Sequence, residues 1–154
     1  RFMYEESFQM PLLMQYKGHI PPGTKIEGFT QNIDFAPTFL DFGGIAVPAD
    51  MQGRSFKELM ETGTTPDDWR RSLYYHYYEF PGFHSVRAHY GVKTDRYKLI
   101  HFYKEGIWEL FDLEADPMEM QNIYGKEGTG EITGKLRQEI LRLQALYEVP
   151  EEHR

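Results

Sequence analysis

The stretch from Tyr90 to Pro117 limits most strongly what this chain can fold into. It contains runs of aromatic and branched residues that are interrupted by polar turns such as Asp95-Arg96 and Lys104-Glu105-Gly106. Runs of this length and spacing are typical of β-hairpins. Together with the Tyr-rich run that begins at Ser72, they predict an antiparallel sheet of about four strands. The predicted strands cover residues 72–80, 85–94, 96–103 and 106–113.

A helix is predicted over residues 131–148. Apolar residues recur there at steps of four and three, which places them on one face: Ile132, Leu136, Ile140, Leu143 and Tyr147. The opposite face carries Lys135, Arg137, Glu139 and Arg142. We therefore expect the apolar face to pack across the predicted sheet.

The first part of the chain has weaker signals. Residues 11–17 are mainly apolar, which predicts a short buried strand. Asp34 can cap a helix that ends at the Gly43-Gly44 pair, and a shorter helix is predicted over 56–61. A polar linker follows at 62–68, so we place a boundary between two halves of the chain there.

Composition excludes several classes. The net charge of −7 argues against a nucleic-acid-binding protein, which usually has a basic surface. The absence of cysteine excludes disulfides and thiolate zinc sites. No run of 18 apolar residues is present, so no membrane span is expected.

Three blocks of sequence resemble one enzyme family and follow its order. They are RFMYEES at 1–7 with MPLL at 10–13, IDFAPTFLD at 33–41 with DMQGRS at 50–55, and YGVKTDRYKLI at 90–100 with WELFDL at 108–113. These blocks resemble the C-terminal part of the type I, formylglycine-dependent sulfatases, which belong to the alkaline-phosphatase-like superfamily. Among these, the chain is most similar in appearance to N-acetylglucosamine-6-sulfatases and other glycosaminoglycan sulfatases.

The resemblance implies an α/β protein whose end is represented here, with an α+β arrangement within these residues. Residues 1–66 would be the trailing part of the large α/β domain, and residues 67–154 the C-terminal antiparallel-sheet subdomain with its terminal helix. The chain opens on Arg1 without an initiator methionine or signal-peptide pattern. We expect a processed product, a truncated chain or the C-terminal piece of a longer protein.

The resemblance also implies hydrolysis of sulfate esters, with sulfated carbohydrate as the partner. Such enzymes use a formylglycine, made from Cys or Ser in a Cys/Ser-x-Pro-x-Arg motif, and Ca²⁺. This chain lacks that motif, and the family's active-site lysine would lie just before Arg1. We therefore assign no catalytic residue and no metal ligand, and expect this chain alone to be inactive. Formylglycine and Ca²⁺ are expected only in the full-length enzyme, together with the N-terminal part of the same protein.

Residues 75–90 contain the best candidates for substrate contact. This segment concentrates His76, His84, Arg87 and His89 with several aromatic residues around a Pro-Gly bend. Aromatic rings stack on the apolar face of a sugar, while His and Arg hydrogen-bond hydroxyls or anionic groups. The alternative for the two strand histidines is that their hydrogen bonds are satisfied locally.

Several side chains outside this segment have structural interpretations. Arg54 is expected to pair with Asp50 or with a backbone carbonyl. Glu5, with Arg1 and Glu6, either supports the upstream lysine or belongs to a surface charge cluster.

Two other functions remain open. The aromatic content permits a carbohydrate-binding or interaction module, and the superfamily includes phosphodiesterases and phosphonate hydrolases. By resemblance, a sulfatase of this kind is periplasmic, secreted or lysosomal.

Overall fold

The computed structural model describes residues 1–153 and contains two compact units. Residues 1–11 and the described residues from 72 onward form the first unit, and residues 12–71 form the second. The predicted boundary between residues 66 and 67 concerns the domains of a longer protein, so it stays a prediction. We describe each unit by itself.

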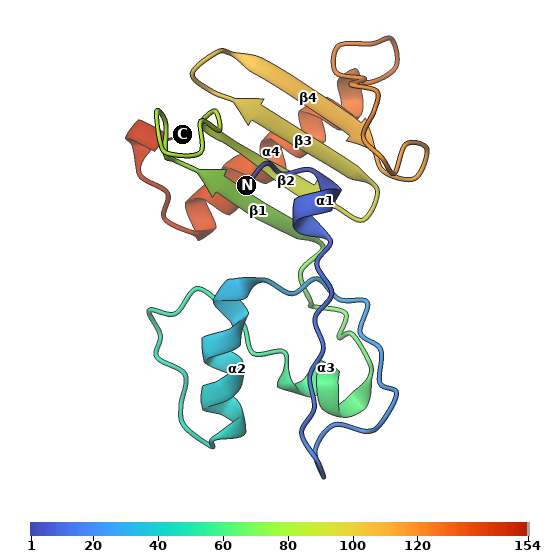
Figure 1. Ribbon diagram of the computed structural model, residues 1–154, viewed down its shortest axis with the longest axis vertical. Coiled ribbons are helices and arrows are strands. Elements are labelled where there is room, and N and C mark those ends of the chain that lie inside the picture. The colour runs from blue at the N-terminus through green and yellow to red at the C-terminus, as the bar shows by residue number, and fades with distance from the viewer. Residues whose placement is uncertain (154) are drawn as a thin grey trace. The chain divides into compact units, whose positions relative to one another are not determined.

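The first unit is built on a four-stranded antiparallel sheet, as predicted (Figure 1). Its strands are β1 (Ser72–Tyr77), β2 (His89–Thr94), β3 (Tyr97–Phe102) and β4 (Ile107–Asp112), which are neighbours in chain order. Every connection between adjacent strands is therefore a hairpin. The connection between β1 and β2 is the longest. Both strands are shorter than predicted on this side, since β1 ends at Tyr77 and β2 begins at His89.

Helix α4 (Gly130–Leu146) covers one face of this sheet (Figure 1). Leu136, Ile140 and Leu143 are buried and pack against strand residues such as Val92 and Leu99. The predicted apolar helix face is thus confirmed. A short helix, η2 (Glu151–His153), follows the end of α4.

The N-terminal segment covers the other face, with α1 (Glu5–Phe8) in front of the sheet (Figure 1). Met3 is fully buried against Ile100 and Phe111. Gly91 makes this close approach possible, since a Cβ atom there would lie 2.7 Å from Met3 Sδ and 2.3 Å from the Leu99 carbonyl oxygen. The N-terminal segment therefore packs directly against the backbone at Gly91, in space that the Cβ atom of any other residue would fill.

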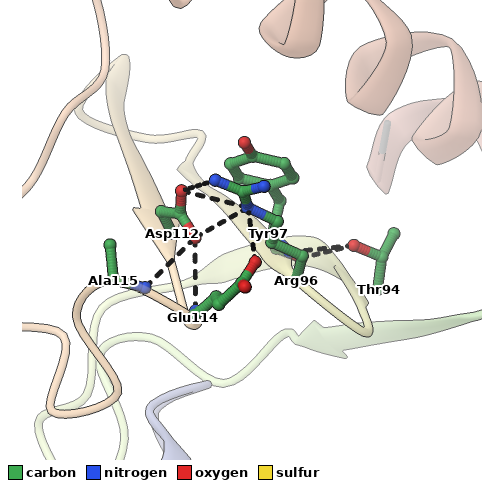
Figure 2. A network of polar contacts seen from close by, with 6 residues as sticks. All are labelled: Thr94, Arg96, Tyr97, Asp112, Glu114 and Ala115. Atoms are coloured by element: carbon green, nitrogen blue, oxygen red, sulfur yellow. Dashed lines mark hydrogen bonds and ion pairs between the residues drawn. The ribbon is translucent and has the colours of Figure 1, made fainter.

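Polar contacts close the end of the sheet near the β2–β3 turn (Figure 2). Thr94 Oγ1 accepts a hydrogen bond from the Tyr97 N–H at 2.9 Å, which fixes the turn. Arg96 pairs with Asp112 at 2.8 Å and with Glu114 at 3.3 Å. The Asp112 carboxylate also accepts the Glu114 N–H at 3.2 Å, so the turn and the loop after β4 share one anchor.

The second unit contains η1 (Asn32–Asp34), α2 (Phe35–Phe42) and α3 (Lys57–Thr62). Its core consists of Phe56, Leu59, Met60 and Trp69. Both helices lie close to their predicted positions.

Asp34 has a different role from the one predicted. It stands at the start of α2, but its side chain does not cap that helix. The buried carboxylate instead accepts the backbone N–H groups of Gln31 at 2.7 Å and Arg54 at 2.8 Å, and it forms an ion pair with Arg70. Through these bonds the Asp34 carboxylate links the start of α2 to the chain at Arg54 and at Arg70.

Two other expectations are corrected here. Residues 11–17 form no strand, because a strand requires a neighbour and the structure pairs none with them. Arg54 pairs with the side chain of Asp68 at 3.0 Å rather than with Asp50. Its predicted bond to a backbone carbonyl is confirmed, with Asp68 O as the acceptor at 3.0 Å.

Candidate functional site

The connection between β1 and β2, residues 78–88, carries the most exposed aromatic surface of the first unit. Phe83 is 93% exposed, and Tyr78 and Phe80 are each about half exposed. Exposed apolar surface that is gathered on one segment can mark a contact with a ligand or with another part of the protein. The connection is therefore the natural place to look for ligand contacts.

His84 and Arg87 both lie on this connection and are exposed. The ring of His84 lies beside that of Phe83, with 5.3 Å between their centroids. The Arg87 guanidinium is 3.8 Å from Glu105, which lies in the turn between β3 and β4. Such an exposed ion pair is weak, so the guanidinium is available to another anion.

His76 lies on β1, opposite Tyr90 and on the sheet face that α4 covers. Its Nδ1 is 3.0 Å from the Tyr74 hydroxyl, and its ring stacks on Tyr78 at 3.8 Å. Its Nε2 is buried without a hydrogen-bond partner among the described residues. Burial lowers the pKa of His76 to about 4, so the ring is neutral at pH 7.

His89 begins β2 and faces the N-terminal segment. Its side chain has no exposed surface and stacks between Phe2 and Tyr77, with centroids 5.7 and 5.8 Å away. Its Nδ1 donates to the Arg87 carbonyl oxygen at 2.7 Å. Burial lowers the pKa of His89, so its Nε2 carries a lone pair rather than a proton.

The structure thus separates the four predicted site residues into two kinds. His84 and Arg87 are exposed on one connection, whereas His76 and His89 lie in the sheet on opposite faces. The side chain of His89 is fully buried, and it holds the end of the 78–88 connection through its bond to the Arg87 carbonyl oxygen.

A buried ion cluster surrounds Lys98, and sequence analysis did not predict it. The Lys98 ammonium has no exposed surface and lies 2.7 Å from Glu5 and 2.6 Å from Glu119, and it donates to the Met3 carbonyl oxygen at 2.6 Å. Lys93 adds a second contact to Glu5 at 2.6 Å. Burial alone would raise the pKa of Glu5, but hydrogen bonds from the two lysines lower it overall.

The cluster fastens the N-terminal segment to β2, β3 and the loop after β4. Glu5 is therefore not part of a surface charge cluster. The available signal was a lysine within the apolar run Tyr97 to Ile100, because a lysine is almost never fully buried unless it is paired.

The described residues do not fit a metal site. Residues 1–153 contain no group of three or more His, Asp or Glu side chains that could hold a metal ion. The sequence also lacks a Cys or Ser in the formylglycine motif. No step through Ca²⁺ or formylglycine can be assigned to this chain. In the same part of the chain, no helix is long and apolar enough to cross a membrane.

Comparison with known proteins identifies the family. Residues 1–146 match the family described as N-sulphoglucosamine sulphohydrolase, C-terminal. The chain belongs to this sulfatase family. The resemblance predicted from the three sequence blocks is thereby confirmed.

The matches to this sulfatase family include a close relative. An N-acetylglucosamine-6-O-sulfatase of Bacteroides thetaiotaomicron is 49% identical over 149 residues, which are 96% of this chain and 27% of the relative. A solved structure of a protein in complex with its substrate D-glucosamine-2-N,6-O-disulfate has a TM-score of 0.93 and 47% identity, and the match covers 98% of this chain and 31% of that one.

A more distant match has a different named activity. A phosphonate monoester hydrolase of Silicibacter pomeroyi gives a TM-score of 0.67 at 27% identity, over 80% of this chain and 27% of that one.

The chain spans less than a third of the length of the N-acetylglucosamine-6-O-sulfatase and of the protein in the substrate complex. Its sheet and terminal helix are those of the sulfatase C-terminal subdomain.

Proposed function

We propose that this chain is the C-terminal part of a sulfatase that hydrolyses sulfate esters of sulfated sugars, and that it supplies substrate-facing residues. The observation that carries the proposal is the match over nearly the whole chain to an N-acetylglucosamine-6-O-sulfatase at 49% identity. Formylglycine and Ca²⁺ would be supplied by the rest of the full-length protein. Residues 1–66 would complete its large domain, and residues 67–154 would form its C-terminal subdomain.

The proposed contact surface is the 78–88 connection. Exposed Phe83 and Tyr78 offer rings for the apolar face of a sugar, and His84 and Arg87 offer donors to hydroxyl or sulfate oxygens. A guanidinium suits a sulfate group because its planar donors match two oxygens at once. The net charge of −7 does not oppose this proposal, since a local cation outweighs distant acidic groups at contact range.

The test is sulfate release by the full-length protein from a panel of sulfated sugars. The panel contains glucosamine derivatives sulfated at N, at O6 or at both, with the matching unsulfated sugars as blanks. We expect release from an O6 or N-sulfated member. Release from none of them, by a protein shown to carry formylglycine, would overturn the proposal.

A second candidate is phosphonate monoester hydrolysis, favoured by the similarity to the Silicibacter pomeroyi enzyme. The same panel should therefore include an aryl phosphonate monoester. Faster turnover of that ester than of every sulfated sugar would favour this candidate. Binding of sulfated sugars without turnover by the full-length protein would favour a carbohydrate-binding module instead.

By the same resemblance we propose that the protein acts outside the cytoplasm, as a periplasmic, secreted or lysosomal enzyme. Fractionation of cells that express the full-length gene would test this location.

A further inference from the structure

A buried amide on α4 contacts the hydroxyl group of a strand tyrosine. Gln144 is 1% exposed, and its Nε2 donates to the Tyr74 hydroxyl at 3.2 Å. A second tyrosine, Tyr90, lies on the neighbouring strand β2, opposite His76.

Each of these tyrosines also meets a histidine. The Tyr74 hydroxyl is 3.0 Å from His76 Nδ1, and the Tyr90 hydroxyl is 2.9 Å from His101 Nδ1. The Tyr74 hydroxyl accepts from Gln144, so its own single proton is free to donate to His76. The Nδ1 atom of His76 is then an acceptor, and the neutral ring carries its proton on Nε2.

The charge state of the rings agrees with this pattern. Burial lowers the pKa of both His76 and His101 to about 4, so both are neutral at pH 7. Burial also raises the pKa of Tyr90, which keeps its hydroxyl protonated. The chain of bonds through Tyr74 therefore runs in one direction, from the Gln144 amide to His76.

The two histidines lie in different surroundings. His101 stacks on Trp108 at 3.8 Å, at the far strand of the sheet. His76 lies next to Tyr78, where the exposed 78–88 connection begins, and its Nε2 has no acceptor among the described residues. A buried N–H without an acceptor is unfavourable, so the fold leaves at this point a donor that another group can complete.

We propose that Gln144 and Tyr74 are positioning residues that hold His76 as an Nε2–H donor for an oxygen of the sulfated sugar. This inference rests on the proposed function, and it deepens it by assigning a neutral donor beside the cationic Arg87. A neutral donor suits a hydroxyl as well as a sulfate oxygen, so His76 would recognise the sugar itself.

The bond pattern is tested first, by nitrogen NMR of the full-length protein labelled only in its histidine rings. We expect an unprotonated Nδ1 and a protonated Nε2 for His76. Tyr74→Phe should move the Nδ1 resonance of His76 and leave that of His101, and Tyr90→Phe should do the reverse. A proton on Nδ1 of His76 in the unmodified protein would overturn the inference, whether or not the protein proves to be a sulfatase.

The donor role is tested by a matched pair of substitutions at His76. A glutamine amide nitrogen can take the place of Nε2, whereas an asparagine reaches only the place of Nδ1. We expect His76→Asn to raise the KM for the sulfated sugar about tenfold with kcat nearly unchanged, and His76→Gln to keep KM within about twofold of the unmodified enzyme.

Tyr74→Phe should raise KM about threefold to fivefold, because the His76 ring loses its fixed orientation, while Tyr90→Phe should leave KM unchanged. Equal KM values in the Asn and Gln variants would contradict the donor role even if sulfate release is normal. No sulfate release by the unmodified enzyme would count against the proposed function, and with it against the sugar as the acceptor, while the NMR result on the bond pattern would stand.

Discussion

At the scale of single residues, the two fully buried charges within residues 1–153, those of Lys98 and Asp34, both have partners. Lys98 is surrounded by Glu5, Glu119 and the Met3 carbonyl, and Asp34 by Arg70 and two backbone N–H groups. Removing one member leaves the others buried and uncompensated, which costs more than the pair itself contributes. These side chains should therefore be far less tolerant of substitution than the exposed ion pairs.

Lys98→Met should lower the free energy of unfolding by about 3–5 kcal/mol, because Glu119 would remain buried without its cation and Glu5 would keep only Lys93. Lys135→Met is the matched control, since Lys135 forms an exposed pair with Glu131 at 2.6 Å. That control should cost about 0.5 kcal/mol or less. Urea unfolding measures both values, and equal effects of the two substitutions would contradict the buried-cluster account.

Neutral histidines make stability depend on pH. His101 has a pKa of about 4 in the folded protein against an ordinary value of 6.5. Between these values the unfolded chain binds more protons than the folded one, so stability should rise with pH across this window and become level above it. His101→Gln should flatten the rise between pH 4 and 6.5, as followed by the unfolding midpoint, while the exposed His84→Gln should not. An unchanged profile in His101→Gln would show that this ring is not held neutral.

At the scale of elements, the N-terminal segment is held on the sheet by its close approach to β2. Met3 lies directly on Gly91, and Lys98 holds the backbone of Met3 from β3. The segment has only one short helix of its own, so its position depends on the contacts of Met3 with Gly91 and Lys98. A substitution at Gly91 should loosen the packing of this segment before it disturbs the sheet face that α4 covers.

Gly91→Ala should destabilise the protein by about 1–3 kcal/mol, because the added methyl group meets the Leu99 carbonyl and Met3 Sδ. Protease cleavage within residues 1–11 should become faster at the same time. Gly134→Ala, on α4 with open space around it, is the control and should be neutral or stabilising. Unchanged protease resistance of residues 1–11 in Gly91→Ala would show that the contact between Met3 and Gly91 does not hold this segment in place.

The regular elements were predictable because their residues repeat with a clear period. The four strands, the 104–106 turn and the apolar face of α4 follow from spacing alone. The roles of Asp34, Lys98 and Gln144 did not, since each depends on partners that lie far away in the sequence. The false strand at 11–17 failed for the same reason, because apolar character says nothing about whether a pairing strand exists.

The candidate site was predicted only in part. The choice of this segment rested on residue type and the Pro-Gly bend. In the structure His84 and Arg87 are exposed on the 78–88 connection, whereas the predicted strand over 85–94 had included Arg87. The burial of His89 and the hydrogen bonds of His76 could not be predicted, because they depend on which face of the sheet each covering element occupies. Whether these residues contact a sugar stays a proposal.

At the scale of the whole molecule, the second unit exposes large apolar side chains. Leu13 is 92% exposed, Phe39 is 62% exposed and Ile45 is 59% exposed. Such surface is unusual for a unit that is complete in water. It agrees with a chain that spans less than a third of its relatives' length.

The 154-residue chain on its own should therefore associate with itself, whereas the full-length protein should not. Light scattering coupled to size exclusion measures both. Replacing Leu13 and Phe39 by Ser should reduce the association of the short chain, while replacing the buried Leu59 by Ser should increase it. A stable monomer of the unmodified short chain would contradict this expectation.

The central claim is that the 78–88 connection of this chain meets the sulfated sugar of a sulfatase. The most direct measurement is sulfate release from a sulfated glucosamine by the full-length enzyme with Arg87→Ala, compared with Arg96→Ala. The side chains of Arg87 and Arg96 are similarly exposed, at 56% and 52%, but Arg96 lies in the β2–β3 turn with Asp112 as its partner. The account predicts a KM about tenfold higher for Arg87→Ala and an unchanged KM for Arg96→Ala. The same KM in both variants would contradict it.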